Sequence, residues 1–182
     1  MLCTFEGLRL FAYRCPAGEP TIGYGHKLTE EELLSGVYSR GITKERAEEL
    51  LDQDIAIAAR TIASVVKVSL NANQRDALIC LVFNAGGGVL LGTAPKMTAA
   101  LKVGDWATAA HEMLDIDKRR DPGTGALVVD AGLHARRQVE AALFLSSTDD
   151  IDHDAVMSAV GVSLCQITAD LEASWIHSTT DA

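Results

Sequence analysis

The most constraining feature of this sequence is a short segment near the start of the chain, from Glu6 to His26. After Glu6 comes a run in which apolar and polar residues roughly alternate, followed by a Pro-Ala-Gly sequence and a glycine-rich stretch. Alternation predicts a half-exposed strand, and proline and glycine predict a turn. The segment therefore predicts a β-hairpin that places Glu6, Cys15 and Thr21 around one cleft.

The rest of the chain shows mainly helical periodicity. Capping boxes begin two of the predicted helices, at Thr29 with Glu32 and at Asn71 with Gln74. A long helix is predicted after Thr43, where apolar residues recur at helical spacing. The predicted helices cover 29–34, 43–66, 71 to the glycines at 86–88, 94–103, 105–114 and 132–146, while the polar residues 115–131 are predicted to form a loop.

Composition limits the partners of this chain. The 182 residues suffice for one well-buried domain, and no apolar run approaches the ~20 residues that span a bilayer, so stable membrane insertion is not expected. Nucleic-acid binding is not expected, because a net charge of −9 provides no basic face. The first five residues lack the basic and apolar regions of a signal peptide, which predicts a cytoplasmic protein.

Cysteine usage predicts no metal site. The four cysteines (Cys3, Cys15, Cys80 and Cys165) lack the spacing of metal ligands, and cysteines of a cytoplasmic protein usually stay reduced. Cys80 lies in an apolar helical run, which favours buried packing. Only Cys15 has a functional interpretation, and neither a metal nor an organic cofactor is indicated.

Residues 147–182 form an acidic extension that differs from the rest. They contain 7 acids and no lysine or arginine, which would repel an anionic membrane. One apolar stripe predicts an amphipathic helix that needs a docking partner, which is the chain's own body, a second copy or another protein. We expect this extension to be a separable regulatory or interaction element. The stripe consists of Val156, Val160, Leu164, Ile167, Leu171 and Trp175.

The segment that begins at Glu6 resembles the phage-type lysozymes, or endolysins, of glycoside hydrolase family 24. That family carries Glu, eight residues, Asp or Cys, five residues and Thr, which correspond here to Glu6, Cys15 and Thr21. Collinear matches continue to about residue 145, and together they are far more specific than one spacing. They comprise residues 22–26, 41–43, 47–54, 73–78, 82–86, Gly132 with Leu133, Arg136 with Arg137, and Glu140.

The resemblance implies an α+β fold that is mainly α, with a small β-hairpin lobe and a larger helical lobe joined by a long helix. The corresponding ranges are about 1–41 for the hairpin lobe, 43–66 for the connecting helix and 67–146 for the helical lobe. Residues 1–146 would form the catalytic domain, with the active site between the lobes.

The resemblance also implies the activity, which is hydrolysis with inversion of the β-1,4 bond between N-acetylmuramic acid and N-acetylglucosamine in peptidoglycan. Glu6 would be the general acid. Cys15 stands where many members carry Asp and would assist the attacking water with Thr21, either as a partial thiolate or by orienting the water. An ordinary thiol is mostly protonated at neutral pH, unlike a carboxylate. The enzyme would wait in the cytoplasm of the infected bacterium until a pore-forming protein releases it to the wall.

Further site residues follow from matching positions of the family. Gly25, Phe83 and Asn84 would bind substrate, with Asn84 able to hydrogen-bond an N-acetyl group. His26 and Asp54 would form a structural pair. Core packing is the alternative for Phe83, and a structural or incidental role is the alternative for Cys15. Glu6 has a candidate partner in Arg136 or Arg137, for which the alternative is an exposed helix face.

Two other functional classes stay open at this point. A lytic transglycosylase would use Glu6 as its single acid and form an anhydro sugar. A wall-binding module would bind peptidoglycan without cleaving it.

Overall fold

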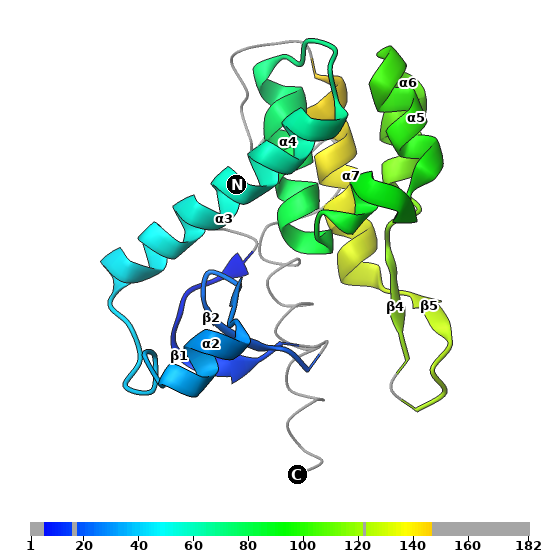
Figure 1. Ribbon diagram of the computed structural model, residues 1–182. Coiled ribbons are helices and arrows are strands. Elements are labelled where there is room, and N and C mark those ends of the chain that lie inside the picture. Colours follow the sequence, from blue (N-terminus) through cyan, green and yellow to red (C-terminus); the bar gives the residue numbers. More distant parts are fainter. Residues whose placement is uncertain (1–5, 16–17, 122, 147–182) are drawn as a thin grey trace. The chain divides into compact units, whose positions relative to one another are not determined.

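The computed structural model describes residues 6–15, 18–121 and 123–146. These residues form two compact units, 6–56 and 57–146, and the division falls between Ala56 and Ile57 inside the long helix α3 (Lys44–Val65). Figure 1 shows the order of the elements along the chain. The fold is α+β and mainly α, as the sequence predicts.

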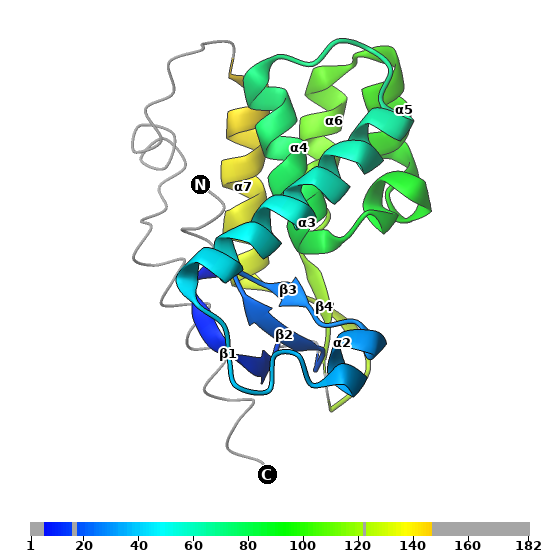
Figure 2. The same cartoon turned by 60° about the vertical axis from the view of Figure 1, so that its left-hand side comes forward.

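The first unit contains a three-stranded antiparallel sheet in the order β1 (Arg9–Arg14), β2 (Pro20–Gly23) and β3 (His26–Lys27). Helix α2 (Glu30–Ser35) follows the sheet, and Figure 2 shows it next to the strands. The predicted capping box begins α2: the Thr29 hydroxyl accepts from the Glu32 backbone N–H, while the Glu32 carboxylate accepts from the Thr29 backbone N–H.

The core of the first unit joins the sheet to α3. Ile22 on β2 is fully buried and packs with Tyr38 and Leu50. The loop before α3 is fastened to β1, because the Ile42 N–H donates to the Leu10 carbonyl at 2.8 Å. Gly41 is required in this loop, since its φ is 78° and a Cβ would lie only 2.7 Å from the Leu10 oxygen.

Strand β1 differs from the half-exposed strand that the alternation predicts. Nearly all of its residues are exposed, and Phe11 is 69% exposed. The register shifts between Arg9 and Tyr13, which disrupts the alternation of faces along the strand. On the returning strand β2, glycine is required at position 23 because of backbone conformation and packing. Its φ is 66°, and a Cβ at this position would lie 3.3 Å from the Ala47 side chain.

The second unit is a helical assembly. It contains α4 (Ala72–Ala85), the π-helical turn η1 (Val89–Thr93), α5 (Pro95–Val103), α6 (Trp106–Met113) and α7 (Ala131–Leu145), together with the end of α3. Helices α4 and α7 lie side by side, as Figures 1 and 2 show. The side chains that fill the core include Leu78, Leu81, Met97, Leu101, Met113, Leu143 and Phe144.

The segment predicted to be a loop at 115–131 contains a second hairpin, so that prediction was wrong. Strand β4 (Lys118–Arg120) pairs with β5 (Leu127–Val129) in an antiparallel ladder. The turn between them is organised by Asp121, whose carboxylate accepts hydrogen bonds from the backbone N–H groups of Gly123 and Thr124. Three-residue strands with every residue exposed leave no alternating pattern in the sequence.

Several expectations concern residues outside the described ranges. They are the helical turn before Glu6 and the amphipathic helix of residues 147–182. In the ranges that are described, no helix combines the length and the apolar character that crossing a membrane requires.

Candidate active site

Glu6 lies shortly before strand β1 of the hairpin. It is the last helical residue, and Gly7 follows with a φ of 63°, the left-handed conformation that commonly ends a helix. The residue is half-buried, and its Oε1 atom is buried. One oxygen of the carboxyl group is therefore shielded from bulk water.

Cys15 and Thr21 are brought together at the far end of the hairpin. The Cys15 N–H and the Thr21 hydroxyl both donate to the carbonyl oxygen of Glu19, each at 2.9 Å. Thr21 is buried, and because its Oγ1 proton is donated to Glu19, this oxygen can take part in further hydrogen bonds only as an acceptor. The Cys15 backbone and the Thr21 side chain are thus held by the same carbonyl oxygen.

Tyr13 belongs to this group, although sequence reasoning missed it. It lies opposite Thr21 in the β1–β2 ladder. Burial raises the pKa of its phenol to about 12. The positive charge of Arg9, whose guanidinium lies 4.9 Å from the ring centre, lowers this pKa, whereas the charges of Glu6 and Cys15 raise it. The phenol therefore stays neutral at working pH. An aromatic residue in a strand carries no sequence signal that separates such a role from packing.

His26 is held between two carboxylates within the first unit. Its Nδ1 lies 2.9 Å from Asp54 Oδ2, and its Nε2 lies 3.4 Å from Glu32 Oε1. The network continues through Tyr38, whose hydroxyl donates to Glu32 and accepts from Arg46. The contact with Asp54 corresponds to the expected pair, whereas Glu32 is a second partner that sequence reasoning did not identify.

The two carboxylates determine the charge of this imidazole. The hydrogen bond with Asp54 raises the pKa of His26 above its ordinary value; burial opposes the rise, and the charges of Asp54 and Glu32 reinforce it. Burial would raise the pKa of Glu32, but hydrogen bonds from Thr29 and His26 outweigh it, so the pKa is lowered. The two carboxylates therefore favour the protonated form of His26, and its pKa lies above the ordinary value.

We expect Asp54→Asn to destabilise the protein more at pH 5 than at pH 9. Because the folded-state pKa of His26 is raised, its stabilisation is present below about pH 6.5 and is lost as pH rises through the folded-state pKa. A hydrogen bond to a charged group contributes about 1.5–3 kcal/mol, which sets the expected loss at pH 5. Urea unfolding at both pH values measures the difference.

Asp52→Asn is the matched control for this experiment, since Asp52 is an exposed carboxylate on the same helix. Its replacement should change stability little at either pH. An equal loss for Asp54→Asn at pH 5 and pH 9 would contradict the account, as would an NMR titration that places His26 at or below about 6.5.

In the second unit, Asn84 is positioned by Arg137. Asn84 and Phe83 lie at the end of α4, and both are half-buried. The Arg137 guanidinium donates to the Asn84 side-chain oxygen, to Glu140, and to the Ile116 carbonyl at 3.0 Å. Arg137 is 1% exposed and Glu140 is fully buried.

Arg136 takes part in the same buried group. Its Nε donates to Glu140 Oε1 at 2.9 Å, and its NH2 donates to the Cys80 carbonyl at 3.3 Å. The alternative that these arginines occupy an exposed helix face is wrong, because Arg136 and Arg137 are 2% and 1% exposed. The pairing of either arginine with Glu6 involves residues of both units and stays a prediction.

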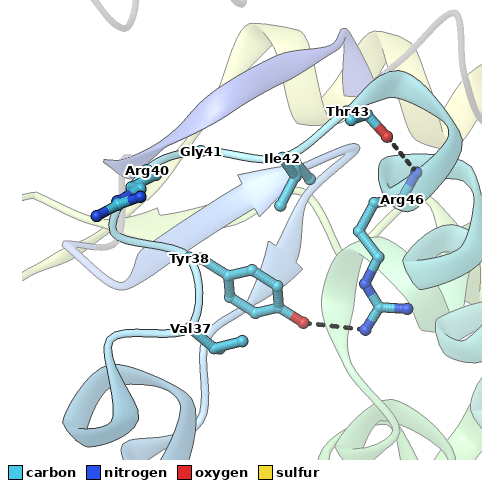
Figure 3. Close-up of a pocket in the computed structure, with 7 residues that line it drawn as sticks. All are labelled: Val37, Tyr38, Arg40, Gly41, Ile42, Thr43 and Arg46. Carbon is cyan, nitrogen blue, oxygen red and sulfur yellow. Dashed lines mark hydrogen bonds between the residues drawn. The ribbon is translucent and has the colours of Figure 1, made fainter.

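A pocket of about 470 Å³ opens in the first unit at the start of α3. Figure 3 shows the Tyr38 hydroxyl bonded to Arg46, and the Thr43 hydroxyl bonded to the Arg46 backbone N–H. The lining contains none of the predicted site residues; it consists of Val37, Tyr38, Arg40, Gly41, Ile42, Thr43 and Arg46. Within the described ranges, no cluster of three potential metal ligands is present.

Comparison with known proteins gives consistent matches. The family model described as phage lysozyme matches residues 3–140. An endolysin from Acyrthosiphon pisum secondary endosymbiont phage 1 is 40% identical over 143 residues, which cover 79% of this chain and 91% of that protein. An endolysin from Salmonella phage P22 is 39% identical over 144 residues, covering 78% and 90%.

A solved structure agrees with these sequence matches. The muramidase domain of SpmX from Asticaccaulis excentricus has a TM-score of 0.65 to this chain and is 31% identical to it. The superposition covers 80% of this chain and 92% of that domain.

Proposed function

Because this chain belongs to the phage lysozyme family and is a lysozyme-type glycoside hydrolase, we propose that it cleaves the β-1,4 bond between N-acetylmuramic acid and N-acetylglucosamine. Its relatives are endolysins, and peptidoglycan is its substrate. Glu6 is the general acid in this proposal, and Cys15 and Thr21 assist the attacking water. Gly25, Phe83 and Asn84 contact the sugar chain.

The chemistry follows from the side chains. Glu6 gives its proton to the glycosidic oxygen, which leaves with the electrons of the broken bond. Water attacks the anomeric carbon from the opposite face, so the configuration inverts. The Thr21 hydroxyl, whose proton is engaged by the Glu19 carbonyl, accepts a hydrogen bond from that water. The Cys15 backbone N–H donates to the same Glu19 carbonyl. The Cys15 side chain either orients the water or, as a thiolate, receives its proton.

The observation that carries this proposal is the arrangement of the hairpin. Glu6 precedes β1, while the Cys15 backbone and the Thr21 hydroxyl share the Glu19 carbonyl at the other end of the strand pair. Tyr13 lies opposite Thr21 in the same strand pair, which adds a phenol to this end of the hairpin. Loss of turbidity of permeabilised bacteria tests the activity, and an intact suspension would contradict it.

The route to the wall and the domain organisation are also part of the proposal. The enzyme accumulates in the cytoplasm of the infected bacterium and reaches peptidoglycan after a separate protein opens the membrane. Residues 1–146 form the catalytic domain, and residues 147–182 are a separable extension. No metal or organic cofactor enters the reaction.

We expect Cys15→Asp to retain activity and Cys15→Ala to lose much of it. Aspartate is the commoner residue of the family at this position, and it can accept the proton of the attacking water. Alanine removes any group that could orient that water. Initial lysis rates of permeabilised cells measure both variants.

Cys80→Ser controls for the loss of a thiol elsewhere. Cys80 is buried in α4, and burial raises the pKa of its thiol to about 12, so it has no role as a thiolate. Its variant should keep the parental lysis rate per folded molecule. If Cys15→Ala matches the parent, no second catalytic group is needed at this position. The single-acid transglycosylase mechanism then becomes the better account.

A further inference from the structure

The guanidinium of Arg137 is fixed at three of its nitrogens. Nε donates to the Ile116 carbonyl, NH1 donates to Glu140, and NH2 donates to the Asn84 side-chain oxygen. The group is planar and rigid, so two fixed nitrogens determine the direction of the third. Burial of Arg137 and Glu140 removes competing water. Asn84 therefore faces an Arg137 N–H donor whose position is fixed by the contacts of Arg137 with Ile116 and Glu140.

This contact determines which way the Asn84 amide faces. A guanidinium has five N–H donors and no acceptor, so only the oxygen of the carboxamide can face it. The amide is planar, and its NH₂ group must then point to the side away from Arg137. This orientation follows from the chemistry of the two groups, whichever way the oxygen and nitrogen were assigned. Half-buried Asn84 thus presents a hydrogen-bond donor at the end of α4.

We propose that Arg137 is a positioning residue that makes Asn84 a dedicated donor, so that this subsite accepts only sugar groups that can accept a hydrogen bond. The inference rests on the proposed function, in which Asn84 contacts the glycan. An acetamido carbonyl satisfies the amide. The ammonium of a de-N-acetylated amino sugar cannot accept a hydrogen bond and meets the positive end of the amide dipole. The subsite therefore distinguishes N-acetylated from de-N-acetylated wall glycan.

The neighbouring arginine provides a matched comparison. Arg136 is also buried and also donates to Glu140, and its NH2 donates to the Cys80 carbonyl. Arg137→Met removes the donor to Asn84 and leaves Arg136 and Glu140 as a balanced ion pair. Arg136→Met leaves Arg137 and Glu140 balanced in the same way. Both variants remove one buried guanidinium that donates to Glu140, and only Arg137→Met also removes the donor to the Asn84 side-chain oxygen.

The experiment compares two preparations of one purified glycan, one chemically de-N-acetylated and the other re-acetylated afterwards. Release of reducing ends gives kcat/KM for each, and their ratio is the preference. The parent should prefer the acetylated glycan by at least about tenfold, and Arg137→Met should reduce this preference about threefold to tenfold, the range for one hydrogen bond. Arg136→Met should leave the preference within about twofold of the parental one.

The second variant, Asn84→Asp, leaves both buried arginines in place. An aspartate would stay paired with Arg137 and present an acceptor where the amide presents a donor. It should lose the preference for acetylated glycan, chiefly through KM.

Each outcome decides the inference. If Asn84→Asp keeps the preference for acetylated glycan, the inference is wrong. It is also wrong if Arg137→Met and Arg136→Met change that preference equally. An active parent with no preference between the two glycans overturns it as well while leaving the proposed function standing. A parent that releases no reducing ends from acetylated glycan overturns the proposed function and this inference together.

Discussion

Glu6→Gln should lower the lysis rate of permeabilised bacteria by about 10²–10⁴-fold, the usual contribution of general acid catalysis. Glutamine keeps the shape of the side chain and removes the proton that the leaving oxygen needs. In our proposal Glu6 is this acid, and one of its carboxylate oxygens is buried. Initial lysis rates at equal concentrations of folded protein measure the effect.

Glu19→Gln is the matched control, because Glu19 is the other acid of the hairpin segment and its carboxylate is exposed and paired with Lys27. Only its backbone carbonyl holds Cys15 and Thr21, and the substitution leaves that group in place. This variant should lyse cells within a few-fold of the parent. Near-UV circular dichroism should show the same fold for all three proteins. Parental activity of Glu6→Gln would exclude Glu6 as the acid.

Glu140→Gln should lower the free energy of unfolding by about 3–5 kcal/mol, the range for breaking a buried ion pair. Glu140 is fully buried and compensates two guanidinium groups, those of Arg136 and Arg137. Glutamine is nearly isosteric, so the loss comes from removing the carboxylate that pairs with both buried guanidinium groups. Such a loss is a large fraction of the total stability of most domains. Urea unfolding monitored by circular dichroism measures it.

The contrasting variant is Glu49→Gln on α3. Glu49 pairs with Arg46 at the same three-residue spacing as Glu140 with Arg137, but its side chain is 63% exposed. Exposed pairs contribute about 0–1 kcal/mol, so this variant should unfold close to the parental midpoint. Equal losses for Glu49→Gln and Glu140→Gln would show that burial of the ion pairs of Glu140 with Arg136 and Arg137 adds nothing to stability.

The sequence predicted elements wherever the signal is local. The capping boxes at Thr29 and Asn71 both form, and the helix predicted after Thr43 is α3. These features depend on side chains within three or four positions of each other, which a sequence displays directly. The hairpin at the start of the chain also forms, because proline and glycine mark its turn.

Features that depend on tertiary packing were harder to predict. The strands β4 and β5 are too short for an alternating pattern, so Lys118 to Arg120 read as part of a loop. The sequence left two alternatives for Arg136 and Arg137, a pairing with Glu6 or an exposed helix face, because arginine favours exposed positions. The signal that could have found their burial is Glu140, three and four residues further along the same helix.

The candidate site shows the same division between local and distant relations. Spacing and resemblance identified Glu6, Cys15 and Thr21, but they could not reveal that Cys15 and Thr21 share the Glu19 carbonyl. Tyr13 carries no motif, and its place opposite Thr21 appears only in the strand register. Glu32 joins His26 through the fold of α2, since six residues separate them along the chain.

The most direct test of the central claim is mass spectrometry of the sugars that the full-length chain releases from purified peptidoglycan. Hydrolysis adds one water across the broken bond, so the account predicts muropeptides with a reducing N-acetylmuramic acid end. The reaction should depend on Glu6 and proceed without added metal. Products that carry an anhydro-muramic end, 18 mass units lighter by the loss of one water, would contradict hydrolysis and identify a transglycosylase, while walls that bind the protein without releasing sugars would contradict catalysis altogether.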